Sequence, residues 1–122
     1  MPRALTVRST TPSGDRLLFG TDFSGLGVVS IQLERAIAGR HRCLQVFACE
    51  SWAAARVFLK ANRTGLAVSH DVMGRPIPAV WLHLYAARPP CQAWAPWGKR
   101  QGLSDAQGRG ELFFEALRLI YL

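Results

Sequence analysis

The sequence is short of acidic residues and of long apolar runs. Among its 122 residues it has eight Asp and Glu against 15 Lys and Arg, which gives a net charge of +7. No apolar run approaches the roughly 18 residues that a membrane-spanning helix needs, so we expect no membrane partner. The excess of positive charge favours nucleic acid or another polyanion as the partner, with a solvated basic surface as the alternative.

Paired cysteines are also lacking. The three that are present are odd in number and lack metal-ligand spacing: Cys43, Cys49 and Cys91. The three histidines complete no ligand set with them, so no metal site is predicted. The pattern disfavours a secreted disulfide framework and favours a reducing compartment. We therefore expect an intracellular protein, nuclear if its source is a eukaryote and otherwise cytoplasmic.

Enough apolar residues are present for a hydrophobic core. Apolar residues make up 49% of the chain and charged residues 19%, and the length corresponds to one domain or part of one. Residues 1–15 have no sustained apolar periodicity and are predicted to be a flexible leader. Residues 16–122 are predicted to form the folded part.

Strand-like and helix-like segments alternate along that folded part. Strands are predicted over 16–21, 44–48, 66–69 and 80–87, and helices over 28–38, 52–61 and 111–122. Gly39 is the expected end of the first helix, Ser51 is the expected cap of the second, and a polar loop of residues 88–109 precedes the last. This order predicts an α/β fold with about four parallel strands and helices on both faces.

Three of these strands end in residues suited to an adenosine ligand. The first runs into the turn Phe23-Ser24-Gly25-Leu26-Gly27, whose glycines let a ligand approach backbone N–H groups at the start of a helix. Glu50 ends the second strand, where an acid can bind ribose hydroxyls. Asp71 follows the third strand and could accept a hydrogen bond from the adenine amino group.

Each of these residues also has a purely structural interpretation. Glu50 could help to begin the second helix, because acids are favourable at a helix start. Trp52 could stack on an adenine ring or pack in the core. Asp71 could form a turn before Gly74.

Cys91 follows the fourth strand in the run Pro89-Pro90-Cys91-Gln92. Open α/β sheets hold their ligands and reacting groups at the carboxyl ends of the strands, and the thiolate of cysteine is a nucleophile. A glycine-rich, basic stretch follows it. Cys91 is therefore the candidate nucleophile for an anionic substrate. A thiol-redox role is disfavoured because no resolving cysteine lies nearby in the sequence.

Together these residues resemble the cytosine-5 DNA methyltransferases, over about residues 17–122 and the amino-terminal part of that catalytic domain. The most specific match is Pro90-Cys91-Gln92-Ala93-Trp94, then Gly98-Lys99-Arg100-Gln101-Gly102, Asp105, Arg109-Gly110 and Leu112-Phe113-Phe114. The resemblance implies part of a Rossmann-like, S-adenosylmethionine-dependent methyltransferase fold. The residues expected to bind this cofactor are Phe23, Ser24, Gly25, Leu26, Gly27, Glu50, Trp52, Asp71, Val72, Pro90 and Leu112.

The resemblance also implies a reaction. The Cys91 thiolate would add to carbon 6 of a cytosine flipped out of double-stranded DNA, and carbon 5 would take the methyl group. DNA contacts are expected from Gln92, Trp97, Gly98, Lys99, Arg100 and Arg109. Trp97 could fill the gap left by the flipped base or anchor the loop. The alternatives are the same chemistry on RNA, a non-catalytic cofactor-binding module, or one half of a split enzyme.

Some positions depart from the pattern of the family that the chain resembles. Val28 replaces a third glycine, Ala95 replaces a serine, and Thr21 replaces an acid, with Asp22 displaced by one position. The Glu-Asn-Val motif and the target-recognition region of that family do not occur in the 122 residues. We therefore expect a fragment that does not methylate DNA alone and needs the rest of the catalytic domain in cis or in trans.

Overall fold

The computed structural model describes residues 16–37 and 42–121. Its elements, in chain order, are β1 (Arg16–Asp22), α1 (Val28–Ile37), β2 (Arg42–Cys49), α2 (Ala53–Asn62), β3 (Ala67–Ser69), β4 (Leu84–Ala87), the 3₁₀ helix η1 (Gly102–Ser104) and α3 (Leu112–Ile120). The predicted leader, residues 1–15, and the predicted helix end at Gly39 lie outside the described residues.

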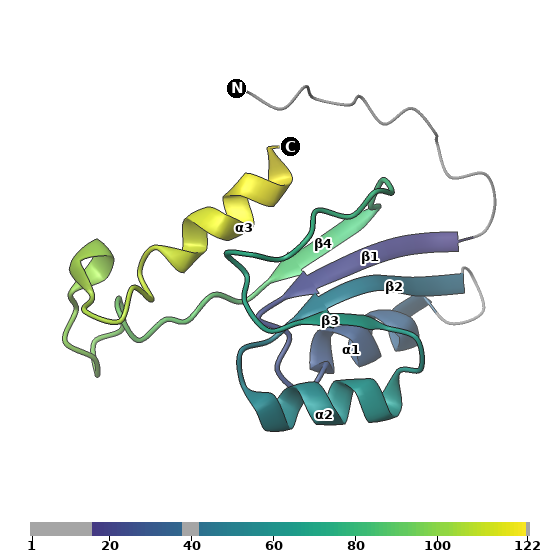
Figure 1. Cartoon of the computed structure of the whole chain (residues 1–122), viewed down its shortest axis with the longest axis horizontal. Helices are drawn as coiled ribbons and strands as arrows, with labels where there is room; N and C mark the ends of the chain where they lie inside the picture. Colours follow the sequence, from purple (N-terminus) through teal and green to yellow (C-terminus); the bar gives the residue numbers. More distant parts are fainter. Residues whose placement is uncertain (1–15, 38–41, 122) are drawn as a thin grey trace.

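The four strands form one parallel sheet in the order β3-β2-β1-β4 (Figure 1). This confirms the expected partial, Rossmann-like α/β fold with four parallel strands. The chain adds strands in one direction from β1 to β3 and then returns to place β4 on the other side of β1. The strand order therefore reverses between β1 and β4, which is the point where such sheets bind ligands at the carboxyl ends of their strands.

Helices α1 and α2 cover the same face of the sheet, although the alternation of elements predicted helices on both faces. Two successive crossovers in one direction, each right-handed, place their helices on one side. Residues of α1, α2 and β2 accordingly line a common cavity, and Glu34 of α1 forms an ion pair of 2.6 Å with Arg63 after α2. A Cβ atom at Gly27 would lie 2.9 Å from Leu59 Cδ2, so glycine there lets α2 approach the turn before α1.

The other face is covered by aromatic side chains and by the β3–β4 connection. A register shift between Phe19 and Gly20 of β1 pairs Gly20 with Phe47 of β2, and a Cβ at Gly20 would lie 2.1 Å from the Phe47 ring. Tyr85 of β4 pairs with the same glycine, and its ring centroid lies 6.5 Å from that of Phe47. Arg75 of the connection lies over the Phe47 ring, 5.3 Å from its centroid.

Strand β4 is shorter than the predicted strand of residues 80–87. His83 donates its backbone N–H to the Leu18 carbonyl over 2.8 Å, but its ring Nδ1 accepts the Leu18 N–H over 2.9 Å. An imidazole therefore takes the place of a strand carbonyl at this position, and the ladder begins only at Leu84. The prediction of a strand over residues 80–83 is wrong for this reason.

Helix α2 does not use the predicted Ser51 cap. Its N-cap residue is Trp52, whose side chain makes no capping hydrogen bond. The Glu50 carboxylate instead accepts the Trp52 N–H over 2.9 Å. A side chain two residues upstream thus satisfies one of the free donors at the helix start.

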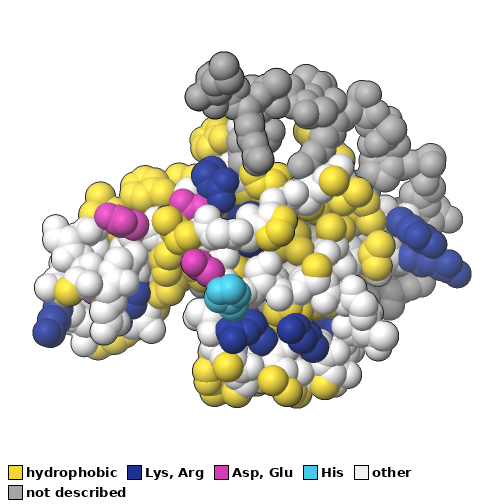
Figure 2. Space-filling model, viewed as in Figure 1, with side chains coloured by type: hydrophobic (Ala, Val, Ile, Leu, Met, Phe, Trp, Pro, Cys, Tyr) yellow, Lys and Arg dark blue, Asp and Glu magenta, His cyan; other side chains and the backbone are white. Residues whose placement is uncertain are grey.

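Helix α3 lies apart from α1 and α2, beyond the β4 edge in the view of Figure 1. Ala116 is its buried residue, whereas Phe113, Phe114 and Ile120 are 47%, 51% and 62% exposed. Figure 2 shows hydrophobic side chains exposed along this part of the molecule. No helix within residues 16–37 and 42–121 is long and apolar enough to cross a membrane.

Candidate cofactor and active site

The turn after β1 has a backbone that most residues avoid. Phe23, Gly25 and Gly27 have φ angles of 55°, 55° and 81°, in the left-handed region that favours glycine. Ser24 ties this turn to the end of β2, because its N–H donates to the Cys49 carbonyl over 3.0 Å and its hydroxyl accepts the Cys49 N–H over 3.2 Å. A Cβ at Gly25 would meet nothing within 4 Å, so the space beside it is open.

Glu50 lies against this turn, as its place at the end of the second strand predicts. Its Oε2 accepts the Gly25 N–H over 2.6 Å, while Oε1 accepts the Trp52 N–H over 2.9 Å. The interpretation of Glu50 as a residue that helps to begin a helix is thereby confirmed. Its ribose-binding role stays a prediction.

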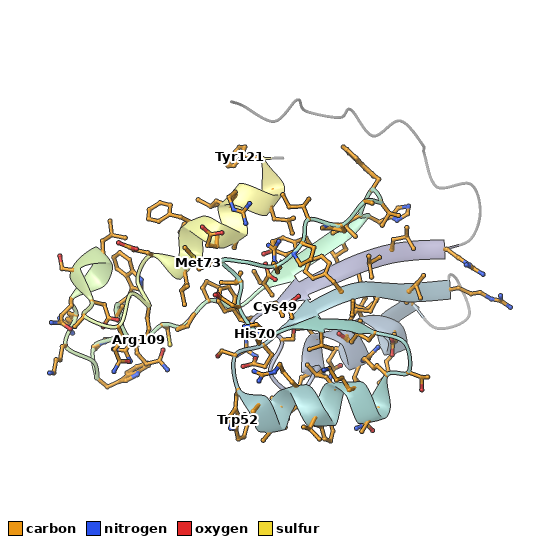
Figure 3. The ribbon with its side chains drawn as sticks, in the orientation of Figure 1. Cys49, Trp52, His70, Met73, Arg109 and Tyr121 are labelled. Atoms are coloured by element: carbon orange, nitrogen blue, oxygen red, sulfur yellow. The ribbon has the colours of Figure 1, made fainter. Side chains whose placement is uncertain are left out.

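Trp52 and Asp71 lie at the same carboxyl edge. Trp52 is 63% exposed at the start of α2, so packing in the core, the alternative for this residue, is wrong (Figure 3). Asp71 is exposed, and its Oδ1 accepts the Met73 N–H over 2.9 Å, which confirms its turn-forming role. Val72 is buried. Contacts of these residues with adenine stay predictions.

A buried ion pair that the sequence analysis missed lies next to the turn. Arg75 Nε donates to Asp22 Oδ1 over 2.7 Å, and Arg75 Nη2 donates to Oδ2 over 2.5 Å. The two side chains are 1% and 0% exposed. Tyr85 donates its hydroxyl to the same Asp22 Oδ2 over 2.6 Å. The sequence holds no local signal for this cluster, because Asp22 and Arg75 come together only when the β3–β4 connection crosses the sheet.

The electrostatics of this cluster favour the charged form of Arg75 and the neutral form of Tyr85. Burial on its own would lower the pKa of Arg75, but the hydrogen bonds and the negative charge of Asp22 outweigh it and raise that pKa. The pKa of Tyr85 is raised by burial first and then by its hydrogen bond to Asp22. Tyr85 therefore stays a neutral donor to a carboxylate that Arg75 neutralises.

Cys91 is the accessible cysteine of the three. It is exposed, and its carbonyl accepts the N–H groups of Trp94 and Ala95 over 2.9 and 2.8 Å, so a tight turn follows it. Cys49 is buried at the end of β2, where burial and then the charge of Asp22 raise its thiol pKa to about 12. Burial also raises the pKa of Cys43. A nucleophilic role stays a prediction, and it suits Cys91 best.

The loop after Cys91 is packed closely on itself. A Cβ at Gly98 would lie 2.1 Å from the Gln92 carbonyl oxygen, and one at Gly110 would lie 2.0 Å from the Gly102 oxygen. The Trp94 ring lies over Gly102, 3.1 Å from where a Cβ would stand. These glycines permit close contacts between backbone segments, and the loop owes its shape to them.

An ion pair between Asp105 and Arg109 holds the far side of this loop. Arg109 Nη2 donates to Asp105 Oδ1 over 2.7 Å, and the Arg109 backbone N–H donates to Oδ2 over 3.1 Å. The hydrogen bond from the Arg109 side chain is the main cause that lowers the pKa of Asp105 to about 2. Arg109, a predicted DNA contact, is thus paired within the loop and remains 33% exposed.

The other predicted DNA contacts project into solvent. Trp97 is 82% exposed, so its alternative role as a hydrophobic loop anchor is wrong. Gln92, Lys99 and Arg100 are also exposed, and Gly98 is half-buried. Figure 2 shows basic side chains on this lobe of the molecule. Two predicted cofactor residues flank the loop, and both are half-buried: Pro90 and Leu112.

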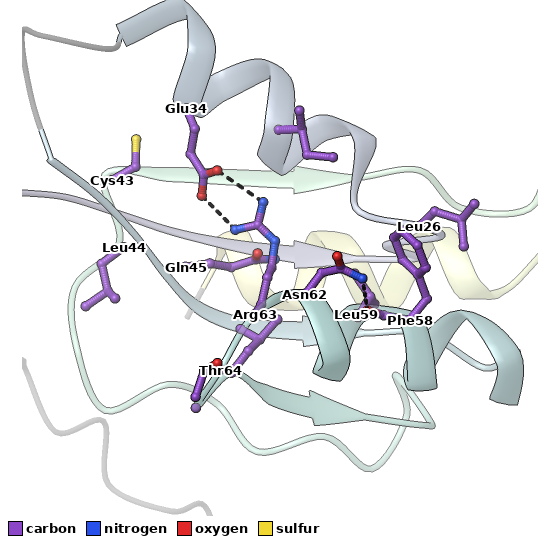
Figure 4. Close-up of a pocket in the computed structure, with 13 residues that line it drawn as sticks. Leu26, Glu34, Cys43, Leu44, Gln45, Phe58, Leu59, Asn62, Arg63 and Thr64 are labelled. Atoms are coloured by element: carbon purple, nitrogen blue, oxygen red, sulfur yellow. Dashed lines mark hydrogen bonds and ion pairs between the residues drawn. The ribbon is translucent and has the colours of Figure 1, made fainter.

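A cavity of about 530 Å³ lies elsewhere, on the α1–α2 face of the sheet (Figure 4). Its lining includes the Glu34–Arg63 pair, Cys43 and Phe58. Leu26 is the predicted cofactor residue that lines it. The cavity therefore adjoins the glycine turn at Leu26 but is not lined by Glu50 or by the other predicted cofactor residues.

Among the described residues, no group of three or more His, Cys, Asp or Glu side chains is placed to hold a metal ion. No curated protein matches the chain. A family model for C-5 cytosine-specific DNA methylases matches residues 22–121, which run from the last residue of β1 through Cys91 to the residue after α3. The chain therefore belongs to the C-5 cytosine-specific DNA methylase family.

Proposed function

We propose that the chain is the cofactor-binding, nucleophile-bearing part of a DNA (cytosine-5) methyltransferase that uses S-adenosylmethionine. The observation that carries the proposal is the Glu50 carboxylate, held 2.6 Å from the Gly25 N–H between the ends of β1 and β2. An acid and a glycine turn at this edge, beside the reversal of strand order, form a site for an adenosine ligand.

The described residues fit S-adenosylmethionine. A carboxylate has about four acceptor positions, and Glu50 uses one on each oxygen for backbone N–H groups, so positions remain for two ribose hydroxyls. Asp71 uses Oδ1 for Met73, which leaves Oδ2 for an adenine amino group. The exposed Trp52 ring offers a surface for stacking, and the space beside Gly25 is open. When bound, the cofactor supplies an electrophilic methyl group.

Cys91 supplies the nucleophile in this proposal. Its thiolate forms a bond to carbon 6 of the cytosine, and the electron pair of the 5,6 double bond makes carbon 5 nucleophilic. Once carbon 5 had taken the methyl group, a base would remove its proton, and the electron pair of that C–H bond would restore the double bond and expel the thiolate, so the cysteine would be regenerated. The exposure of Cys91 supports this role, because a base flipped out of the duplex can reach it.

Exposed groups of the Cys91 loop support a nucleic-acid substrate. Lys99 and Arg100 lie close in sequence to the exposed Trp97 and can contact phosphates on either side of a flipped base. The indole of Trp97 is then available to stack where the base has left the duplex. The net charge of +7 favours such an encounter with DNA.

Cofactor binding is tested by calorimetry with S-adenosylmethionine on the 122-residue chain. We expect binding in the wild type and about a tenfold weaker Kd for Glu50→Gln, since a hydrogen bond to a charged group contributes about 1.5–3 kcal/mol and the amide keeps part of it. Glu115→Gln on α3 is the control and leaves the Kd unchanged. Equal binding by Glu50→Gln and the wild type would contradict the ribose-binding role.

The nucleophile is tested by covalent trapping on duplex DNA that contains 5-fluorocytosine, in the longest polypeptide that carries these 122 residues. We expect an adduct in the presence of S-adenosylmethionine that survives denaturation and is lost in Cys91→Ser. Cys43→Ser is the matched control and retains it. An adduct in Cys91→Ser would exclude Cys91 as the nucleophile, and an adduct on fluorocytosine RNA alone would replace DNA by RNA as the substrate.

A further inference from the structure

One buried carboxylate joins the four segments that carry the candidate site. Asp22 directly precedes the turn that begins at Phe23, and its side chain accepts hydrogen bonds from Arg75 and Tyr85. Its carbonyl accepts the N–H of Arg88, three residues before Cys91, over 3.4 Å. The turn, the β3–β4 connection, β4 and the start of the Cys91 loop therefore meet at one residue.

Arg75 is the tether of the connection. Within the described part of the chain, the hydrogen bonds that join residues 71–79 to other elements come from the Arg75 side chain to Asp22. Arg75 lies four residues after Asp71, and the turn Asp71–Gly74 between them is closed by the bond from Met73 N–H to Asp71. Asp71 is therefore held from two sides, by the β3 ladder and the bond from Glu50 N–H to the Ser69 carbonyl before it, and by Arg75 after it.

The pair is well suited to fix a position. A guanidinium bound to a carboxylate through two nitrogens is defined in direction as well as in distance. Both side chains are almost fully buried, the Phe47 ring packs against the guanidinium, and Tyr85 holds the second carboxylate oxygen. Small movements of the connection would break several of these contacts together.

We propose that Arg75 is a positioning residue for adenine recognition, which acts through Asp22 and Tyr85 to hold Asp71 and Val72 at the cofactor site. This rests on the proposed function, because it assumes that the adenosine part of the cofactor lies at Asp71. It also gives a role to Asp22. This aspartate lies one position after the acid of the family pattern, whose place Thr21 takes in this chain. Asp22 points into the protein and binds Arg75, so it is not a group that contacts the cofactor.

The test measures selectivity for the adenine amino group. Calorimetry compares S-adenosylhomocysteine with S-inosylhomocysteine, which lacks that group. We expect the wild type to prefer the adenosine compound about tenfold, the value of one hydrogen bond. In the triple variant Asp22→Leu, Arg75→Met, Tyr85→Phe, which removes the three polar partners of the cluster together, the preference falls to about twofold or less. If Arg75 had a purely structural role, the triple variant would bind both compounds more weakly by the same factor.

A second variant and a second measurement guard against misfolding. Arg75→Lys keeps the charge but lacks the planar fork, and we expect an intermediate preference. Amide hydrogen exchange of residues 71–79 rises in both variants, while exchange in β1 and β2 stays as in the wild type. The double variant Glu115→Gln, Arg118→Met removes an exposed ion pair and is the control, with the wild-type preference expected.

The outcomes separate this inference from the proposed function. An unchanged preference in the triple variant overturns the positioning role of Arg75. If the wild type binds neither compound, the proposed function fails, but the exchange measurement still tests whether Arg75 holds the β3–β4 connection in place. Unchanged exchange of residues 71–79 in the triple variant then overturns the positioning role of Arg75.

Discussion

The two halves of the candidate site are built in different ways. The cofactor half, formed by the glycine turn, Glu50 and Asp71, stands on the ends of parallel strands and over the buried Asp22–Arg75 pair. The Cys91 half is a loop that holds its shape through contacts within itself, from the turn at Cys91 to the Asp105–Arg109 pair. The first half depends on contacts between segments that are distant in the sequence, and the second on contacts within one loop.

This difference suits the two tasks that we propose. A cofactor is bound best by groups that do not move, because preorganised sites lose less entropy on binding. A flipped base must be admitted and released, so the nucleophile is better carried by a unit that can move without disturbing the sheet. Figure 3 shows the separation, with Arg109 in the loop lobe and Cys49 and His70 at the sheet. Three substitutions or conditions can break or sharpen the comparison.

The largest effect is expected from Arg75→Met. The substitution leaves the Asp22 carboxylate buried without its counter-charge, and breaking a buried ion pair in this way costs about 3–5 kcal/mol. Urea denaturation followed by circular dichroism measures the loss of unfolding free energy. The control is Arg63→Met, which removes the more exposed pair with Glu34 and costs about 0–1 kcal/mol. Similar losses for the two variants would contradict the view that the cofactor half depends on its buried pair.

Gly110→Ala tests the Cys91 half. The new Cβ would lie 2.0 Å from the Gly102 backbone oxygen, which cannot move away as a side chain can. We expect a loss of about 1–3 kcal/mol, typical of overpacking. The loss should appear as faster amide exchange in residues 92–111, with β1 and β2 unaffected. Gly74→Ala is the matched control, because nothing lies within 4 Å of its Cβ position. Global unfolding in Gly110→Ala would show that the two halves are not independent.

The same division marks what the sequence could predict. The strand ends that carry the turn, Glu50 and Asp71 were predictable, because alternation of strands and helices places successive strand ends at one edge. The Asp22–Arg75 pair was not, since only the path of the β3–β4 connection across the sheet brings the two together. The amino end of β4 was mispredicted because the apolar run of residues 80–83 gave no sign that the His83 ring would accept the Leu18 N–H.

Within the Cys91 loop, the sequence motif indicated which residues matter but not why. Gly98, Gly102 and Gly110 were identified through their match to the motif. The structure shows backbone and ring atoms where their side chains would be. Arg109, a predicted DNA contact, pairs with Asp105 within the loop, and its contact with DNA stays a prediction. The spacing of a motif gives only the order of its residues along the chain. The close contacts of these glycines depend on how the loop folds back on itself, which the spacing does not show.

The smallest effect is expected from acid. The pKa of Asp105 is lowered to about 2, chiefly by the hydrogen bond from the Arg109 side chain, so the folded loop binds the ionised carboxylate more favourably than the unfolded loop does. The pair therefore contributes its full stabilisation above the ordinary pKa of aspartate, near 4, and loses it as the pH falls towards 2. Amide chemical shifts and exchange of Gln107 and Arg109, followed from pH 5 to pH 2, should report this loss. Asp105→Asn removes the titration and leaves the chemical shifts, and the exchange rates relative to those of an unfolded chain, independent of pH. If the loop titrates in that variant as in the wild type, another group controls it, and the Cys91 half is not held by this local pair.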